Sequence, residues 1–179
     1  MNSLQLEQIL ERDEFTKTKK CFVIARDIFI NKNIPAPSFI ICNTDNSDGT
    51  GIHWFVVYYE DYNHVELFDS FALLSIDETL MNKIISLAPN MTYNDTVIQG
   101  SNSSVCGQYC IIFLLLRSRG HSFHQIIRWL LHCKNIEQRD HTVNEIINQR
   151  YNHLLEIPLY PHDFTFIDDS MMTYKTCEL

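Results

Sequence analysis

Cys106 stands at the point where a polar loop runs into an apolar segment. Residues 99–104 are polar or glycine, whereas residues 111–116 are all apolar. A helix that begins at this junction would place the thiol beside unsatisfied N–H groups and the positive end of the helix dipole, which favour a thiolate. The pattern therefore predicts a nucleophilic cysteine. A thiolate that attacks a carbonyl group also needs a base, a group that orients the base, and donors for the oxyanion.

Three residues upstream are of the types that meet these needs: His53, Asp69 and Gln99. The run 52–59 and the run 64–69 are typical of β-strands, and the four polar residues between them predict a hairpin. An antiparallel return would bring His53 and Asp69 to one edge of the sheet. A carboxylate there would fix the tautomer of the imidazole, and the Gln99 carboxamide would donate to the oxyanion.

Each of these residues alone has a simpler structural interpretation. A cysteine at a helix start is more often a packing residue, and a single histidine is more often structural or exposed. Cys110, one turn after Cys106, is expected to pack in the core rather than to form a redox pair. The histidines at 121, 124, 132 and 141 fit solvated helix faces better than a metal site, so no metal or cofactor is expected. The joint order of the four candidates favours catalysis.

The remaining elements are predicted from periodicity and from breaking residues. Residues 38–42 form an apolar run, residues 43–51 form a loop, and residues 21–29 fit either a strand or a helical turn. A further short strand is expected over 95–99, where it would deliver Gln99 to the loop before Cys106. Helices are expected over residues 3–13 (capped by Ser3), 77–87, 105–119, 122–133 and 140–155.

Composition fits one soluble domain spanning residues 1–179, with residues 157–179 as a loosely packed tail. The 179 residues are 45% hydrophobic and 20% charged, and 22 acidic residues against 14 basic ones give a net charge of −8. This charge argues against nucleic acid as a partner. No apolar run of about 20 residues is present, so no membrane association is expected. The six cysteines lack the density of a disulfide scaffold, which favours an intracellular, reducing compartment (host cytoplasm or nucleus) or a virion. The chain is also expected to be a monomer.

Four blocks of the sequence, in order, resemble the adenovirus-type cysteine proteinases (adenains) and their relatives in Maverick/Polinton transposons and adintovirus-like viruses. The blocks are Asn-Thr-Asp at 43–45, Gly-Ile-His-Trp at 51–54, Leu-Phe-Asp-Ser-Phe at 67–71, and the stretch 97–107, followed by Cys110 and Phe113. The resemblance covers about residues 38–120, with a weaker echo over 1–37. The fold it implies is α+β, a small mixed or antiparallel sheet flanked by helices, with the nucleophile at the start of a central buried helix.

The resemblance also implies roles. Cys106 would be the nucleophile and His53 the base that later protonates the leaving group. Asp69 would orient His53, and Gln99 would share the oxyanion with the Cys106 backbone N–H. Gly51 and Trp54 would contact substrate, although core packing is an equally good interpretation of Trp54.

The implied function is a thiol endopeptidase that cleaves viral or transposon capsid precursors after Gly-Gly or Gly-X sites. The alternative is a deubiquitinase or an isopeptidase for a ubiquitin-like modifier, because the same residues serve both chemistries. The seven-residue step from Gln99 to Cys106 favours the viral group. A third hypothesis is a catalytically inactive peptide-binding module that keeps the groove.

The chain departs from the adenovirus pattern in two respects. Asp69 stands where the adenovirus enzymes often have glutamate. Those enzymes are activated by a disulfide-linked peptide and by DNA, but residues 90–96 contain no cysteine to anchor such a peptide, and the net charge is −8. Neither activation is therefore expected here.

Overall fold

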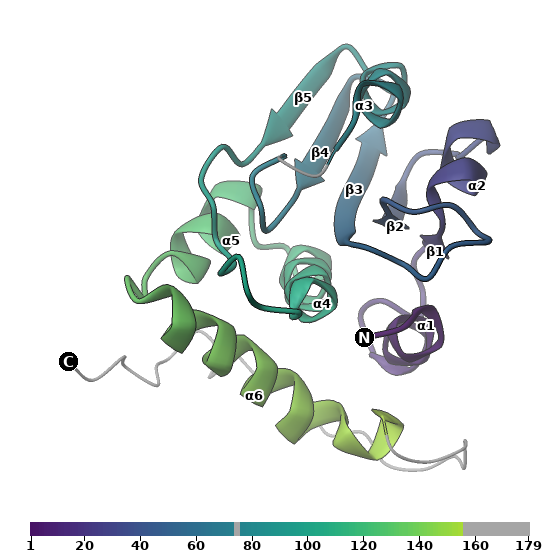
Figure 1. Cartoon of the computed structure of the whole chain (residues 1–179). Coiled ribbons are helices and arrows are strands. Elements are labelled where there is room, and N and C mark those ends of the chain that lie inside the picture. The colour runs from purple at the N-terminus through teal and green to yellow at the C-terminus, as the bar shows by residue number, and fades with distance from the viewer. Residues whose placement is uncertain (74–75, 156–179) are drawn as a thin grey trace.

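A five-stranded mixed sheet forms the centre of the protein (Figure 1). The computed structural model describes residues 1–73 and 76–155. The strands lie in chain order, with β1 parallel to β2, β4 parallel to β5, and antiparallel pairing between β2 and β3 and between β3 and β4. Their bounds are β1 Cys21–Ile24, β2 Ser38–Asn43, β3 Trp54–Asp61, β4 His64–Phe68 and β5 Asn90–Tyr93.

The predicted hairpin is confirmed as β3 and β4. Val56 pairs with Phe68 near one end of the hairpin, and a register shift between Tyr59 and Asp61 lies near the other. His53 directly precedes β3 and Asp69 directly follows β4, so the two residues lie at the same edge of the sheet. The antiparallel return thus joins residues that are 16 positions apart in the chain.

Among the described residues, six helices lie on the two faces of the sheet. The faces are unequal: α2 and α3 pack on one, while α1, α4, α5 and α6 lie on the other (Figure 1). This arrangement shows a mixed α/β architecture, compatible with the predicted α+β class. The helices are α1 Ser3–Arg12, α2 Arg26–Asn31, α3 Glu78–Ile85, α4 Cys106–Ser118, α5 Phe123–Leu130 and α6 Ile136–Leu155.

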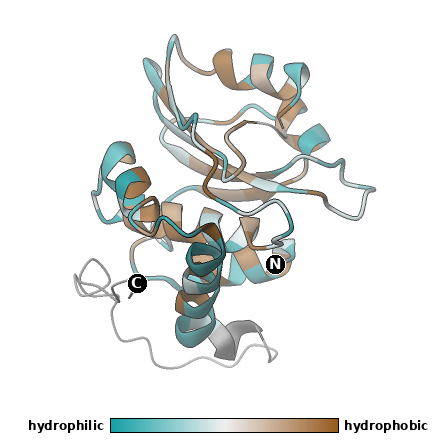
Figure 2. Ribbon diagram, turned by 60° about the vertical axis from the view of Figure 1, so that its left-hand side comes forward, coloured by the Kyte–Doolittle hydropathy of each residue, from teal (hydrophilic) through white to brown (hydrophobic). Residues whose placement is uncertain are grey.

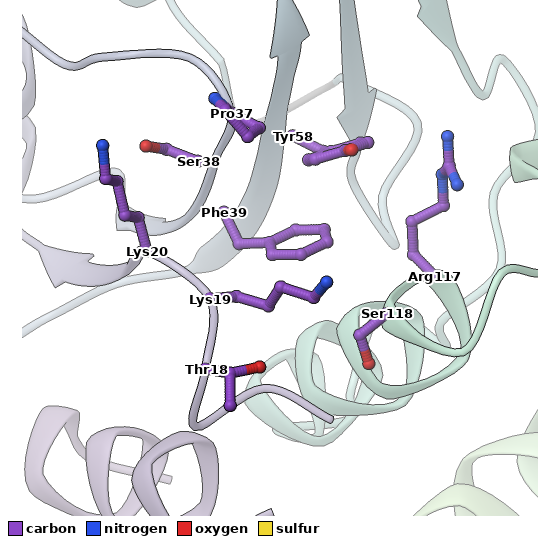
Figure 3. A pocket seen from close by; sticks show the side chains of 9 residues that line it. All are labelled: Thr18, Lys19, Lys20, Pro37, Ser38, Phe39, Tyr58, Arg117 and Ser118. Carbon is purple, nitrogen blue, oxygen red and sulfur yellow. The ribbon is translucent and has the colours of Figure 1, made fainter. Parts of the chain in front are cut away.

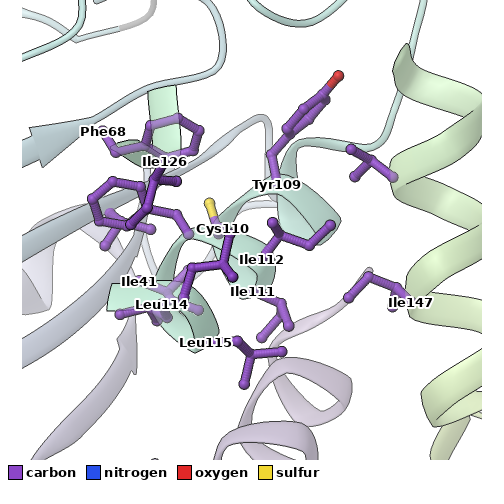
Figure 4. Packing of buried hydrophobic residues seen from close by; sticks show 14 of the residues in the cluster. Ile41, Phe68, Tyr109, Cys110, Ile111, Ile112, Leu114, Leu115, Ile126 and Ile147 are labelled. Atoms are coloured by element: carbon purple, nitrogen blue, oxygen red, sulfur yellow. The ribbon is translucent and has the colours of Figure 1, made fainter. Parts of the chain in front are cut away.

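Helix α4 is buried between the sheet and the outer helices (Figure 4). Nine of its thirteen residues are buried, which accounts for the unbroken apolar run in the sequence. Phe113 stacks on Phe68 of β4 with ring centroids 4.6 Å apart, and it also meets Phe123 of α5 edge to face. The position of the helix start, and therefore of Cys106, is fixed by this packing.

Helix α6 is the outermost element, and most of its residues are hydrophilic (Figure 2). Val143, Ile147 and Tyr151 recur every four residues and are buried against the core that contains α4. This spacing gives one apolar stripe along the helix. Among the described residues, no helix combines the length and the apolar character needed to cross a bilayer.

The strand predicted over 95–99 is wrong. The fifth strand is β5, residues 90–93, and the chain after it forms a loop. The backbone N–H groups of Ile98 and Gln99 both donate to the carbonyl oxygen of Ser70, at 2.9 and 3.0 Å, instead of joining a ladder. A β-forming sequence is therefore bound to the turn after β4 instead of to a neighbouring strand.

Several predicted boundaries also change. Residues 21–29 divide into strand β1 and the start of α2, so both interpretations hold in part. Asn2, not Ser3, caps α1. Its side-chain oxygen accepts from the Gln5 backbone N–H, and the Gln5 side-chain oxygen accepts from the Asn2 backbone N–H. Helix α6 begins at Ile136 rather than at 140, since the Asn135 side chain accepts from the first N–H groups of the helix. The predicted tail over 157–179 lies outside the described residues.

Candidate active site

An open groove of about 790 Å³ runs along the edge of the sheet past the N-terminus of α4. It brings together five of the six predicted site residues; the sixth, Asp69, lies directly behind His53. The groove also takes in the first residues of the chain and the loop between β2 and β3. Its lining includes Met1, Ile28, Gly51, Ile52, His53, Trp54, Phe71, Gln99, Ser103 and Cys106.

His53 and Asp69 form a buried pair. The Nε2 atom of His53 lies 2.7 Å from Oδ1 of Asp69, and the side chains are 3% and 0% exposed. Phe71 lies against the imidazole ring, with centroids 4.7 Å apart and planes inclined by 32°. The carboxylate and the phenyl ring together fix the position and orientation of the imidazole.

Asp69 is itself held by the turn that follows β4. Its carboxylate oxygens accept from the backbone N–H groups of Phe71 and Leu73 at 2.9 and 3.0 Å. Ala72 and Leu73 both have positive φ, 56° and 69°, and this left-handed backbone lets the turn wrap around the carboxylate. On the other side, the buried Asn94 side chain bonds both to the N–H and to the carbonyl group of Asp69.

The second ring nitrogen of His53 is left for Cys106. Nδ1 is buried and has no hydrogen-bond partner among the described residues, and the ring and the thiol shift each other's pKa. Burial alone would lower the pKa of His53, but the hydrogen bond with Asp69 and the interaction with the Cys106 thiol outweigh burial and raise the pKa to about 9. The imidazole is therefore protonated at neutral pH.

The pKa of the Cys106 thiol shifts in the opposite direction to that of His53. Burial tends to raise the pKa of Cys106, but the interactions with His53 and with the backbone N–H groups of Trp54 and Gly107 outweigh burial and lower the pKa below its ordinary value. Cys106 is the first residue of α4, as the sequence predicts. The two shifts favour a thiolate–imidazolium pair.

Gln99 lies on the same groove as Cys106, in a fixed orientation. Its Nε2 donates to the carbonyl oxygen of Ser103 at 2.7 Å, and its Oε1 accepts from the Ser70 hydroxyl at 2.7 Å. The side chain is 1% exposed. A carboxamide has two N–H donors, so one remains for the groove.

The predicted substrate-contacting residues are Gly51, in the loop between β2 and β3, and Trp54, the first residue of β3. Gly51 has φ of +83°, and a Cβ atom there would come within 3.2 Å of the Asn43 side chain, so only glycine fits without strain. Trp54 packs against the core and also lines the groove, so its core packing is confirmed, while its contact with substrate stays a prediction. Its indole N–H donates to the backbone carbonyl oxygen of Met1 at 3.1 Å.

Helix α6 also holds the loop that contains Gln99, a contact that the sequence pattern does not predict. Arg139 donates to the carbonyl oxygen of Ile98 at 2.6 Å, and Asp140 accepts from the Gly100 N–H at 3.0 Å. These bonds grip the chain on both sides of Gln99. Periodicity alone could not reveal them, because Arg139 and Asp140 are polar residues that become buried only through this packing.

Cys110 belongs to the core, as expected (Figure 4). It is 1% exposed, and burial raises its pKa well above the ordinary value. Cys106, Cys110 and the other described cysteines are free thiols. Burial raises the pKa of Cys21, Cys42 and Cys110, whereas the surroundings of the thiol in the groove lower its pKa.

A second hollow, of about 270 Å³, lies at the other end of α4 (Figure 3). Lys19 and Lys20 border it, together with Arg117 and the stacked rings of Phe39 and Tyr58. Neither a cysteine nor a histidine lines it. The groove at Cys106 is therefore the better candidate for nucleophilic chemistry.

Comparisons with known proteins identify no family. No family model and no curated protein matches the chain. Among solved structures, the chain is similar to the central domain of the uncharacterized Lpg1148 protein from Legionella pneumophila, with 15% identity and a TM-score of 0.46 over 88% of this chain and 98% of that one. We infer no activity from a likeness at this distance.

Proposed function

We propose that the protein is a cysteine endopeptidase with an adenain-type fold. The observation that carries this proposal is the buried His53, which contacts Asp69 through one nitrogen and leaves the other for a thiol of lowered pKa at the start of a helix. This is the arrangement that an activated thiol nucleophile requires. The groove beside it has a volume of about 790 Å³, which is within the usual range of ligand-binding sites.

The residues suggest a two-step reaction. The Cys106 thiolate attacks the carbonyl carbon of the scissile bond, while the Gln99 amide and the Cys106 backbone N–H stabilise the oxyanion. The His53 imidazolium then protonates the departing amine, which leaves an acyl thioester on Cys106. His53, now neutral, takes a proton from a water molecule that attacks the thioester, and the free carboxylate and thiolate are restored.

The proposed substrates are proteins cut after Gly-Gly or Gly-X sites, capsid precursors of a virus or transposon in particular. An indole beside the nucleophile favours glycine over a larger side chain at the cleaved position. No metal or cofactor takes part in this scheme. An isopeptidase of a ubiquitin-like modifier would use the same groove and residues, and the experiment below separates the two.

The deciding experiment measures cleavage of a Gly-Gly peptide library by the wild-type chain, by Cys106→Ala and by Cys21→Ala. Cys21 lies on β1, does not line the groove, and has a pKa raised by burial to about 11, so its removal should leave activity unchanged. Cys106→Ala should lower kcat by about 10³-fold or more. Cleavage that survives in Cys106→Ala would overturn the assignment of the nucleophile.

Electrophilic probes distinguish the alternatives. A Gly-Gly peptide with a C-terminal vinyl sulfone should label Cys106 in an endopeptidase. Labelling by a ubiquitin probe carrying the same electrophile, without cleavage of the peptide library, would replace the proposal with the isopeptidase. A wild-type chain that reacts with neither probe would support an inactive binding module.

A further inference from the structure

Ser70 makes three hydrogen bonds to the segment formed by Ile98 and Gln99. The Ser70 carbonyl oxygen accepts from the backbone N–H groups of Ile98 and Gln99, and the Ser70 hydroxyl donates to Oε1 of Gln99 at 2.7 Å. Both side chains are buried, at 1% exposure each. Ser70 directly follows Asp69, so one turn after β4 contacts both the group that orients the base and the group that faces the oxyanion.

The hydrogen bonds determine which way the Gln99 carboxamide points. The Ser103 carbonyl oxygen can only accept, so the atom 2.7 Å away from it must be Nε2. Oε1 then faces Ser70, whose hydroxyl is its donor. Without that hydroxyl, Oε1 would be buried with no described partner, and the carboxamide would gain by rotating away from the groove.

The fixed amide leaves one N–H of Nε2 unused. Gln99, Ser103 and Cys106 line the same groove, and the described chain offers this second N–H no other acceptor. A donor that is locked before substrate arrives needs no reorganisation as negative charge develops. The orientation of Gln99 therefore matters as much as its presence.

From this geometry we infer that Ser70 is a positioning residue, which holds the Gln99 carboxamide in the orientation that donates to the oxyanion. The inference rests on the proposed function, because it concerns the transition state of peptide cleavage. Ser70 acts through Gln99 and has no contact of its own with substrate. Its removal should weaken the stabilisation of the transition state and leave the thiolate and the binding of substrate intact.

The test compares two reactions of Cys106. Cleavage of a fluorogenic Gly-Gly amide passes through an oxyanion, whereas attack on 2,2′-dipyridyl disulfide forms a mixed disulfide, releases pyridine-2-thione and involves no carbonyl group. Ser70→Ala should lower kcat about tenfold with KM within about twofold of wild type. The rate and pH profile of the disulfide reaction, corrected with Cys106→Ala, should not change. Ser38→Ala is the matched control, since Ser38 is equally buried but bonds to Pro35 outside the groove.

A double-mutant cycle completes the test. Gln99→Ala should lower kcat by about 10²-fold, and adding Ser70→Ala to it should change kcat by less than about twofold, because the group that Ser70 orients is gone. Additive losses, an unchanged kcat in Ser70→Ala, or an equal loss in the disulfide reaction would overturn the inference alone. A wild-type chain that cleaves no amide would overturn the proposed function and the inference with it.

Discussion

Two described histidines each lie against a carboxylate, but their surroundings differ. His53 and Asp69 are 2.7 Å apart and only 3% and 0% exposed, whereas His64 and Glu60 are 2.9 Å apart and 28% and 36% exposed. The second nitrogen of His53 is left for a thiol, while that of His64 lies 2.8 Å from the Thr92 hydroxyl. A carboxylate on one nitrogen is therefore a common structural device. The group on the other nitrogen decides whether the pair can do chemistry.

The surroundings of His64 also resemble a metal site at first sight. Glu60, His64 and Glu66 place potential ligand atoms within 4.8 Å of one another. Arg117, however, donates to Glu66 at 2.9 Å and to Glu60 at 3.0 Å, so a guanidinium already supplies the positive charge there. We assign this cluster a structural role, as the point where the end of α4 is tied to β3 and β4.

The largest difference between the two histidines should appear on their removal. His53→Ala should lower kcat/KM for a Gly-Gly peptide by about 10³-fold or more, because base, acid and thiolate stabilisation are lost together. His64→Ala should change it by less than about twofold. Steady-state kinetics on the two variants, with circular dichroism to verify folding, checks this. Similar losses of kcat/KM in His53→Ala and His64→Ala would show that the two histidines do not differ in function.

Substitution of the carboxylate should likewise lower kcat at Asp69 and not at Glu60, with a smaller effect than removal of the histidine. Asp69→Asn should lower kcat by about 10²-fold, since an amide neither stabilises the imidazolium nor fixes the required tautomer. Glu60→Gln, its counterpart at His64, should leave kcat unchanged. Comparable kcat values for Asp69→Asn and wild type would show that Asp69 only supports the turn.

The cluster at His64 should instead affect stability. Arg117→Met leaves Glu66, which is 4% exposed, without its cation and should lower the free energy of unfolding by about 2–3 kcal/mol. Urea denaturation measures this loss, and kcat of the folded fraction should equal that of wild type. A large fall in kcat at unchanged stability would instead tie this end of α4 to catalysis.

Of the two histidines, His53 and not His64 should determine how activity depends on pH. The thiolate forms as pH rises through the lowered pKa of Cys106, and the imidazolium loses its proton as pH rises through about 9, so kcat/KM should fall about tenfold from its plateau by pH 10. His64→Gln should have the same profile. In His53→Gln, the pKa of Cys106, read from the disulfide reaction, should rise towards its ordinary value. A descending limb that moved in His64→Gln would contradict this assignment.

The sequence predicts the hairpin and the buried helix well because both depend on apolar patterning. Strand β3 and helix α4 are long apolar runs, and packing them together is enough to bring His53 to Cys106. Alternation along a regular strand would place the side chains of His53 and Trp54 on opposite faces, yet both line the groove. The rule does not apply, because Trp54 is the first residue of the strand and His53 precedes it.

The parts that escaped prediction depend on single hydrogen bonds. The left-handed turn at Ala72 and Leu73 follows from the bonds of Asp69, and nothing in those two residue types indicates positive φ. The loop that contains Gln99 has the composition of a strand but is bound by Ser70. Such turns and loops have no periodic sequence pattern, so their conformation can be seen only once the positions of the surrounding strands and helices are known.

The bond between the Trp54 indole and the Met1 carbonyl oxygen has a practical consequence for protein production. Met1 also packs within 3.0 Å of where a Cβ atom on Gly107 would lie, so Met1 is close to the nucleophile. A purification tag fused ahead of Met1 would leave its linker at the mouth of the groove, where it competes with any peptide offered. Assays should therefore use protein from which the tag and linker have been removed, because a tagged sample would show no cleavage even where the enzyme itself is active.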